Sequence, residues 1–279
     1  MLGVGAVGVG AAGLGAAAWQ RRKKKLTATA KQQFYELSTH YSELSQRLDA
    51  LDIRANSLSS PLANAELRSQ WTTIRDEFLS LNNRVGALNL TLTSDDKEFY
   101  AKHKQIASAH ETLESMSNAE DNINLMFELE NGDQIKRERE LRSIKQDLSE
   151  ALFEVRNREA IRQLKNVEAQ VEELMRDLQA PDFMDRLARI VSDQAHALEL
   201  ASRDMKHLDR EAHRDERPSL TDRDWRPGYV YSNWVPYYLL ASWHSADTRA
   251  AESSSSSSGG IANTSFSSGF SGGGGSSSW

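Results

Sequence analysis

The sequence predicts an all-α protein in which long antiparallel helical hairpins form a coiled-coil-like bundle. Helix-breaking residues are rare in the middle of the chain, because six of the sixteen glycines precede residue 16, seven follow residue 258, and only five prolines occur. Apolar residues also recur there with helical spacing. Each predicted helix therefore carries an apolar stripe that must be buried against another helix.

Composition divides the chain into five regions. Residues 1–20 form a candidate transmembrane helix, residues 21–25 a basic stop, residues 26–217 the helical bundle, residues 218–250 an aromatic-rich segment packed on or extending the bundle, and residues 251–279 a disordered Ser/Gly tail. The net charge is −6 and 27% of residues are charged, almost all of them in the middle. The chain has no cysteine, which excludes disulfides, cysteine metal sites and thiol catalysis.

The uncharged residues 2–19 predict a membrane span. As a helix they would be about 27 Å long, close to the ~30 Å hydrocarbon core of a bilayer. Basic residues follow directly and should hold the bulk of the chain in the cytoplasm, in contact with anionic lipid headgroups rather than with nucleic acid: Arg21, Arg22, Lys23, Lys24 and Lys25. We therefore expect a single-pass protein of the cell membrane.

Two alternatives remain for this N-terminal stretch, because glycine and alanine make it only marginally hydrophobic. It could be a signal peptide cleaved near residues 16–18, which would make the protein an exported surface protein, or it could be a flexible leader. No basic side chain precedes the stretch, however, and five cations follow it directly, which opposes export.

Two heptad seams open the predicted bundle. The first contains Phe34, Leu37, Tyr41, Leu44, Leu48 and Leu51, and the second contains Leu67, Trp71, Ile74, Phe78, Leu81 and Val85. A turn that ends at Pro61 separates them, so the two helices should pair as an antiparallel hairpin.

Later helices follow from capping residues and breakers. Residues 86–93 should connect two helices, and Asp95 and Asp96 should begin the next, which slackens near Asn118 and stops at Asn131-Gly132. The longest uninterrupted helix is expected over residues 134–179, before Pro181, and the last over residues 182–213.

The segment 225–244 is the candidate partner-binding site. It holds three of the six tryptophans and four of the seven tyrosines, and Pro227 and Pro236 exclude a single regular helix. Three interpretations are open: a cap on the bundle, a binding surface for an unidentified protein partner, and a contact with the membrane interface. The aromatic residues concerned are Trp225, Tyr229, Tyr231, Trp234, Tyr237, Tyr238 and Trp243.

No motif for catalysis, cofactor binding or metal binding stands out. The phosphate loop and paired Glu-x-x-His motifs are both missing from the sequence. His103 and His110 share one helical face, but histidines at this spacing are far more often packed in a bundle than bound to metal. We therefore expect a non-enzymatic protein without cofactor, with the lipid bilayer and a protein as partners, and with self-association as a further option.

The final residues, 270–279, are a glycine–serine run that closes on Trp279. This ending, after an apolar stretch, a basic stop and a helical region, resembles the C-terminal part of actinobacterial TPM-domain membrane proteins. It is also similar to a corynebacterial group of membrane proteins with a domain of unknown function. The resemblance implies a membrane-tethered helical scaffold or, alternatively, the cytoplasmic regulatory part of a phosphatase-related protein. The sequence contains no TPM domain, so no catalytic residue carries over.

Overall fold

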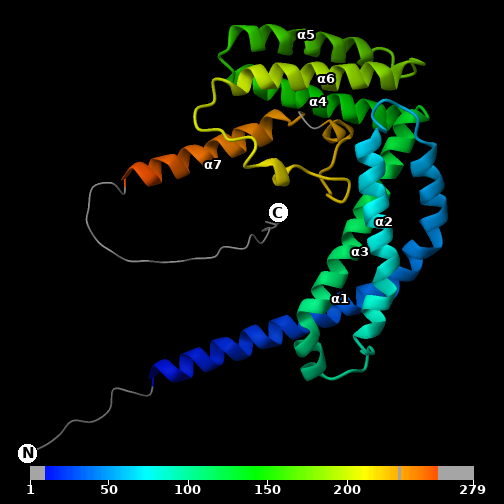
Figure 1. The fold of residues 1–279 in the computed structure, drawn as a ribbon, viewed down its shortest axis with the longest axis vertical. Helices are drawn as coiled ribbons and strands as arrows, with labels where there is room; N and C mark the ends of the chain where they lie inside the picture. The colour runs from blue at the N-terminus through cyan, green and yellow to red at the C-terminus, as the bar shows by residue number, and fades with distance from the viewer. Residues whose placement is uncertain (1–9, 232–233, 257–279) are drawn as a thin grey trace, which may run out of the picture.

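The computed structural model describes residues 10–231 and 234–256, and helices are the only regular secondary structure in this part of the chain, which has no strand. The all-α part of the predicted fold class is therefore confirmed for the described residues. The helices, shown in Figure 1, are α1 (Gly10–Ser57), α2 (Ala65–Ala87), α3 (Asp96–Glu130), α4 (Gln134–Glu154), α5 (Arg158–Met175), α6 (Phe183–Ser202) and α7 (Tyr237–Ser256), with the short 3-10 helices η1 (Arg214–Glu216) and η2 (Pro227–Val230).

Helices α1, α2 and α3 form an elongated three-helix bundle (Figure 1). The ion pairs Lys31–Asp96 and Arg47–Glu120 show that α1 and α3 run parallel, with α2 antiparallel to both. Both predicted seams are buried, except that Tyr41 and Val85 are only partly covered. The predicted hairpin of α1 and α2 exists, but both helices bury their seams largely against α3.

Helix α3 starts with the predicted N-terminal cap. The Asp95 carboxylate accepts hydrogen bonds from the backbone NH groups of Lys97 and Glu98, while the Glu98 side chain accepts from the Asp95 NH. This reciprocal capping box satisfies donors that a helix start leaves open. The predicted slackening near Asn118 is wrong, because α3 continues to Glu130. Asn118 and Asn122 stay in the helix and donate to backbone carbonyls of residues 220–222.

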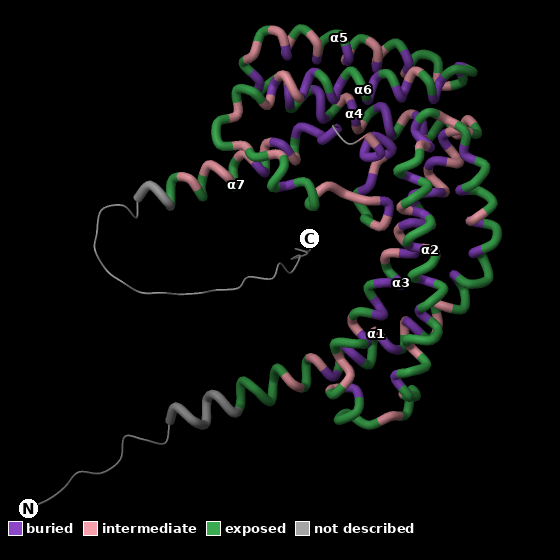
Figure 2. The backbone as a smooth tube through the Cα atoms, viewed as in Figure 1, coloured by how far each residue is buried: buried purple, intermediate pink, exposed green. Residues whose placement is uncertain are grey.

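Helices α4, α5 and α6 form a second helical unit, where the sequence predicted one long helix over residues 134–179. The chain leaves α4 at Val155 and restarts at Arg158 after Asn157, whose side chain accepts from the NH groups of Glu159 and Ala160. Folding back places the apolar face of α5 against α4 and α6, which a single straight helix could not do. Figure 2 shows the buried backbone concentrated inside these two units.

The C-terminal part of the described chain departs from prediction at two points. The sixth helix ends at Ser202 rather than near residue 213, and the described residues between it and α7, 203–231 and 234–236, contain only η1 and η2 as regular structure. Helix α7 then continues to Ser256, so the first residues of the predicted Ser/Gly tail are helical. The remainder of that tail, residues 257–279, lies outside the described residues.

Helix α1 is one continuous helix of 48 residues that includes the basic stop. Its first part projects beyond the end of the bundle (Figure 1). Within residues 10–231 and 234–256, no helix is both long and apolar enough to cross a membrane. The predicted span covers residues 2–19, and residues 2–9 of it lie outside the described part.

Candidate functional site

The basic residues predicted to face lipid lie on the projecting part of α1. Arg21, Arg22, Lys24 and Lys25 are exposed. Lys23 is partly covered, because its ammonium lies 5.4 Å from the ring centroid of Trp19 and 4.8 Å from that of Tyr100 on α3. Trp19 itself is 56% exposed. Four cations and the Trp19 ring are therefore exposed at the end of the molecule where α1 leaves the bundle.

The aromatic segment packs into the molecule instead of forming an open surface. Five of the seven candidate partner-binding residues are buried: Trp225, Tyr229, Trp234, Tyr237 and Trp243. Tyr231 is partly buried and Tyr238 is 42% exposed. This burial supports the interpretation as a cap, and a direct role in partner binding stays a prediction for Tyr231 and Tyr238 only.

A buried carboxylate, Asp147 of α4, holds this cap in place. Its Oδ2 accepts hydrogen bonds from the backbone NH of Tyr237 at 3.0 Å and from Gln194 Nε2 at 2.7 Å, and its Oδ1 accepts from the NH of Tyr238 at 3.3 Å. Tyr237 and Tyr238 are the first residues of α7, so Asp147 caps that helix from a distant part of the chain. Burial raises the pKa of Asp147, although the two backbone hydrogen bonds oppose the rise.

Trp234 continues this polar network into the core. Its indole Nε1 donates to Gln194 Oε1 at 3.2 Å, and its ring meets that of Tyr229 edge-on, with centroids 4.9 Å apart. Gly228 is required beside it, because a β-carbon there would lie 2.8 Å from the Trp234 ring. The chain therefore approaches the indole closely, and the aromatic segment has one well-defined packing.

Arg226 adds a charge to the same region. Its guanidinium lies 3.5 Å from Glu140 Oε1, and its carbon centre is 5.9 Å from the centroid of the Trp234 ring. It also favours the ionised form of Asp147 electrostatically. The buried acid therefore has a cation nearby as well as three hydrogen-bond donors.

A second polar cluster joins residues 203–216 to α7. His213 stacks on Trp243 with nearly parallel rings 5.0 Å apart, and its two ring nitrogens lie 2.9 Å from Asp247 Oδ1 and 2.9 Å from Glu216 Oε2. Burial lowers the pKa of His213, but the hydrogen bond to Asp247 and the nearby carboxylate of Glu216 outweigh it and raise the pKa above its usual value. The arrangement therefore places the imidazole between two carboxylates, which favour its protonated form.

His103 and His110 do not share a site. His103 Nδ1 lies 2.6 Å from the carbonyl oxygen of Tyr100, whereas His110 Nε2 lies 2.5 Å from Glu36 Oε2 on α1. In the part of the chain that the structure describes, no group of three or more histidine and acidic side chains has the geometry to hold a metal ion. His110 and Glu36 instead link the parallel helices α3 and α1.

Neither Asp147 nor His213 was singled out from the sequence alone. One signal for Asp147 existed: Pro236 precedes α7 where a capping side chain would normally stand, so the helix needs a cap from elsewhere. A second was the position of Asp147 among the apolar residues Ile144, Leu148 and Ala151 on one face of this helix. Neither signal identifies the partner, which lies 90 residues further along the chain.

No family model matches this chain, and neither a curated protein nor a solved structure does so. The class is therefore defined by the fold itself: a helical protein with two packed helical units, a projecting N-terminal helix and an aromatic cap held by a buried acid.

Proposed function

We propose that this protein is a non-enzymatic helical scaffold, tethered to the cell membrane through residues 2–19, with its bundle in the cytoplasm. The observation that carries the proposal is the continuity of α1, which runs without interruption from Gly10 through the basic stop into the buried seam of the bundle. A tether and a folded body thus share one helix.

The continuity of α1 fixes how the bundle is positioned relative to the bilayer. A helix of 48 residues is about 72 Å long at ~1.5 Å per residue. No proline or glycine interrupts it between Gly15 and Ser57, and α1 curves along the bundle without a break (Figure 1). A bundle attached in this way is held at a set distance and direction from the bilayer, which suits a scaffold that presents a surface to a partner.

The polar groups of the core support a structural role. Asp147 caps α7, and Asn122 of α3 donates hydrogen bonds to the carbonyls of residues 220 and 222. His213 pairs with Asp247 and Glu216. Each of these groups is engaged by protein atoms in a fixed arrangement. Reactive groups in active sites are instead poised toward a cavity that admits substrate.

Membrane fractionation tests the tether. The full-length chain should stay with membranes after washing in high salt and in alkaline carbonate, because burial of apolar residues resists both treatments while purely electrostatic attachment does not. Release of the chain by carbonate alone would refute an embedded tether.

A further inference from the structure

A groove of about 510 Å³ lies between the end of α2 and the first half of α3. Three basic side chains line it, Arg84, Lys102 and Lys104, together with the polar residues Gln105 and Ser108. None of the residues that line the groove is acidic. A cavity with this lining favours an anion.

The cations of the groove have only neutral partners. Arg84 donates to the hydroxyl groups of Ser108 and Thr112, each at 3.0 Å, and Lys102 donates to the backbone carbonyl of Leu88. Within residues 10–231 and 234–256, none of Arg84, Lys102 and Lys104 forms an ion pair. Their charge is therefore available to phosphate oxygens, for which arginine and lysine are the usual protein ligands.

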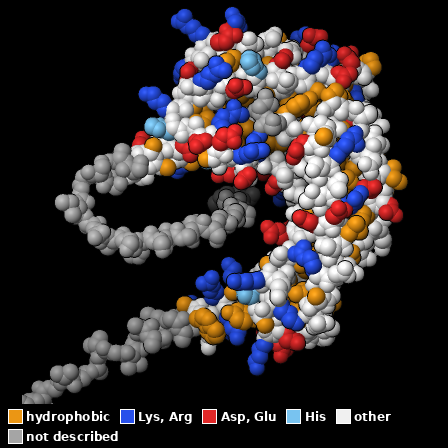
Figure 3. All heavy atoms as spheres, in the orientation of Figure 1, with side chains coloured by type: hydrophobic (Ala, Val, Ile, Leu, Met, Phe, Trp, Pro, Cys, Tyr) orange, Lys and Arg blue, Asp and Glu red, His pale blue; other side chains and the backbone are white. Residues whose placement is uncertain are grey.

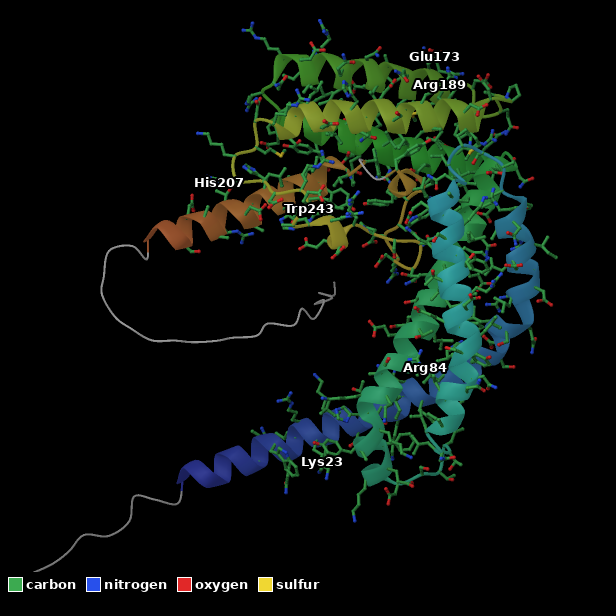
Figure 4. All side chains as sticks on the ribbon, in the orientation of Figure 1. Lys23, Arg84, Glu173, Arg189, His207 and Trp243 are labelled. Atoms are coloured by element: carbon green, nitrogen blue, oxygen red, sulfur yellow. The ribbon has the colours of Figure 1, made fainter. Side chains whose placement is uncertain are left out.

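The groove is continuous with the basic part of α1. Tyr100, Lys104 and Ser108 follow one another at four-residue spacing and so lie on one face of α3. Lys23 of α1 packs over the Tyr100 ring at one end of this row, and Arg84 of α2 bonds to Ser108 at the other. Figure 4 labels Lys23 and Arg84 in the lower half of the bundle.

Charge is distributed unevenly along the molecule. Residues 19–31 and 84–104 contain ten lysines and arginines against three acidic residues, whereas the whole chain contains 34 against 40. Figure 3 shows basic side chains gathered where α1 leaves the bundle. Leu92, in the connection between α2 and α3 at this end, is 60% exposed. Cations beside an exposed apolar side chain match the chemistry of an anionic bilayer surface.

We propose that the groove of Arg84, Lys102 and Lys104 binds the phosphate of an anionic lipid headgroup. The bundle then lies with its α2–α3 end against the bilayer instead of standing off it. The proposal rests on the proposed tether, which brings this end of the molecule to the membrane. It adds a second, headgroup-specific contact that the tether does not require.

The test uses the full-length chain, whose lack of cysteine permits a single label. Gln105→Cys carries an environment-sensitive fluorophore in the groove, and the chain is added to phosphatidylcholine vesicles with or without phosphatidylglycerol. Flotation with phosphatidylcholine alone reports the tether. A blue shift of the fluorophore that requires phosphatidylglycerol reports the groove, so the failure of one proposal is distinguishable from the failure of the other.

Substitution of the three cations provides the decisive comparison. Arg84→Gln, Lys102→Gln and Lys104→Gln together should abolish the blue shift, and should weaken the phosphatidylglycerol-dependent part of binding about 100-fold, at roughly fivefold per cation. The control, Arg139→Gln with Lys165→Gln and Lys206→Gln, removes the same charge from exposed positions on α4, α5 and residues 203–236 and should retain the shift. Lys104→Glu alone should also lose the blue shift. Because Lys104 is exposed, such a loss cannot be attributed to misfolding.

Two results would overturn the proposal. One is a blue shift that persists in the triple variant or is lost equally in the control. The other is saturable binding of inorganic phosphate to the groove, measured by calorimetry, with no phosphatidylglycerol-dependent shift, because the groove would then recognise free phosphate rather than lipid.

Discussion

Replacing Asp147 with alanine should detach the C-terminal cap from the second helical unit. The substitution removes the acceptor for three donors: the NH groups of Tyr237 and Tyr238 and the side-chain amide of Gln194. Two of these donors, Gln194 Nε2 and the NH of Tyr237, are in fully buried hydrogen bonds. No nearby residue on α7 can replace the cap, because Pro236 precedes the helix.

The magnitude follows from the donors left unsatisfied. A buried polar group without a partner costs about 1–3 kcal/mol, so three donors at the lower end give about 3 kcal/mol. The loss of a buried carboxylate offsets part of this cost, since ionised Asp147 is itself opposed by burial. We therefore expect a net loss of about 2–3 kcal/mol, or roughly 5–10 °C in Tm for a protein of this size.

Hydrogen exchange measures this effect where it arises. In Asp147→Ala, amides of α7 and of residues 225–236 should exchange about 30-fold to 150-fold faster, while amides of α1–α3 keep their protection. Gln146→Ala is the matched control, because Gln146 is exposed on the same helix and makes only a hydrogen bond to Glu150. Unchanged protection of α7 in Asp147→Ala, or equal loss in both variants, would refute the capping role.

Two further predictions concern the same cap. Because the pKa of His213 is raised in the folded protein, its protonation stabilises the fold. This stabilisation is fully present below pH 6.5, the usual pKa of histidine, and is lost as the pH rises through the folded pKa. The attachment of residues 203–216 to α7 should therefore weaken on going from mildly acidic to mildly alkaline pH. His213→Gln should remove that dependence in an exchange experiment across this range, and an unaltered pH profile would show that another group is responsible. At the acid end, the pKa of Asp247 is lowered, by the hydrogen bond from the Asp209 backbone first and by His213 second, so its contribution is lost as pH falls through that pKa. Gly228→Ala should destabilise the protein by about 1–3 kcal/mol, since the new methyl group would overlap the Trp234 ring; a melting temperature equal to that of the unmodified chain would mean that the indole has room to move.

The parts of the fold that sequence predicts are those set by local spacing. The heptad seams of α1 and α2 could be predicted because the residues of each seam recur at regular spacing along a single helix. The start of α3 could be predicted because the residues of its cap lie within four positions of one another. The turn at residues 155–157 is less visible, since Asn157 is a weak breaker amid strong helix formers.

The parts that sequence could not give depend on distant residues. Asn118 looked like a weakening of α3, yet it and its neighbour Asn122 donate hydrogen bonds to carbonyls about 100 residues away. For the aromatic segment the sequence left a cap, a binding surface and a membrane contact open, because tyrosines and tryptophans suit all three. Contacts with Asp147, Gln194 and Gly228 place most of it in the core. Only the three-dimensional arrangement distinguishes a buried aromatic cluster from an exposed one.

The central claim is that α1 joins a membrane span to a cytoplasmic bundle, and single-cysteine labelling in intact membrane vesicles tests it most directly. The chain has no cysteine of its own, so Ala12→Cys and Ala28→Cys each place one thiol, the first within the predicted span and the second after the basic stop. We predict that the thiol at position 12 reacts with a membrane-impermeant maleimide only after detergent is added. The thiol at position 28 should react in inside-out vesicles and not in right-side-out ones. Reaction of position 12 in intact vesicles, or of position 28 from the outer face, would contradict the account.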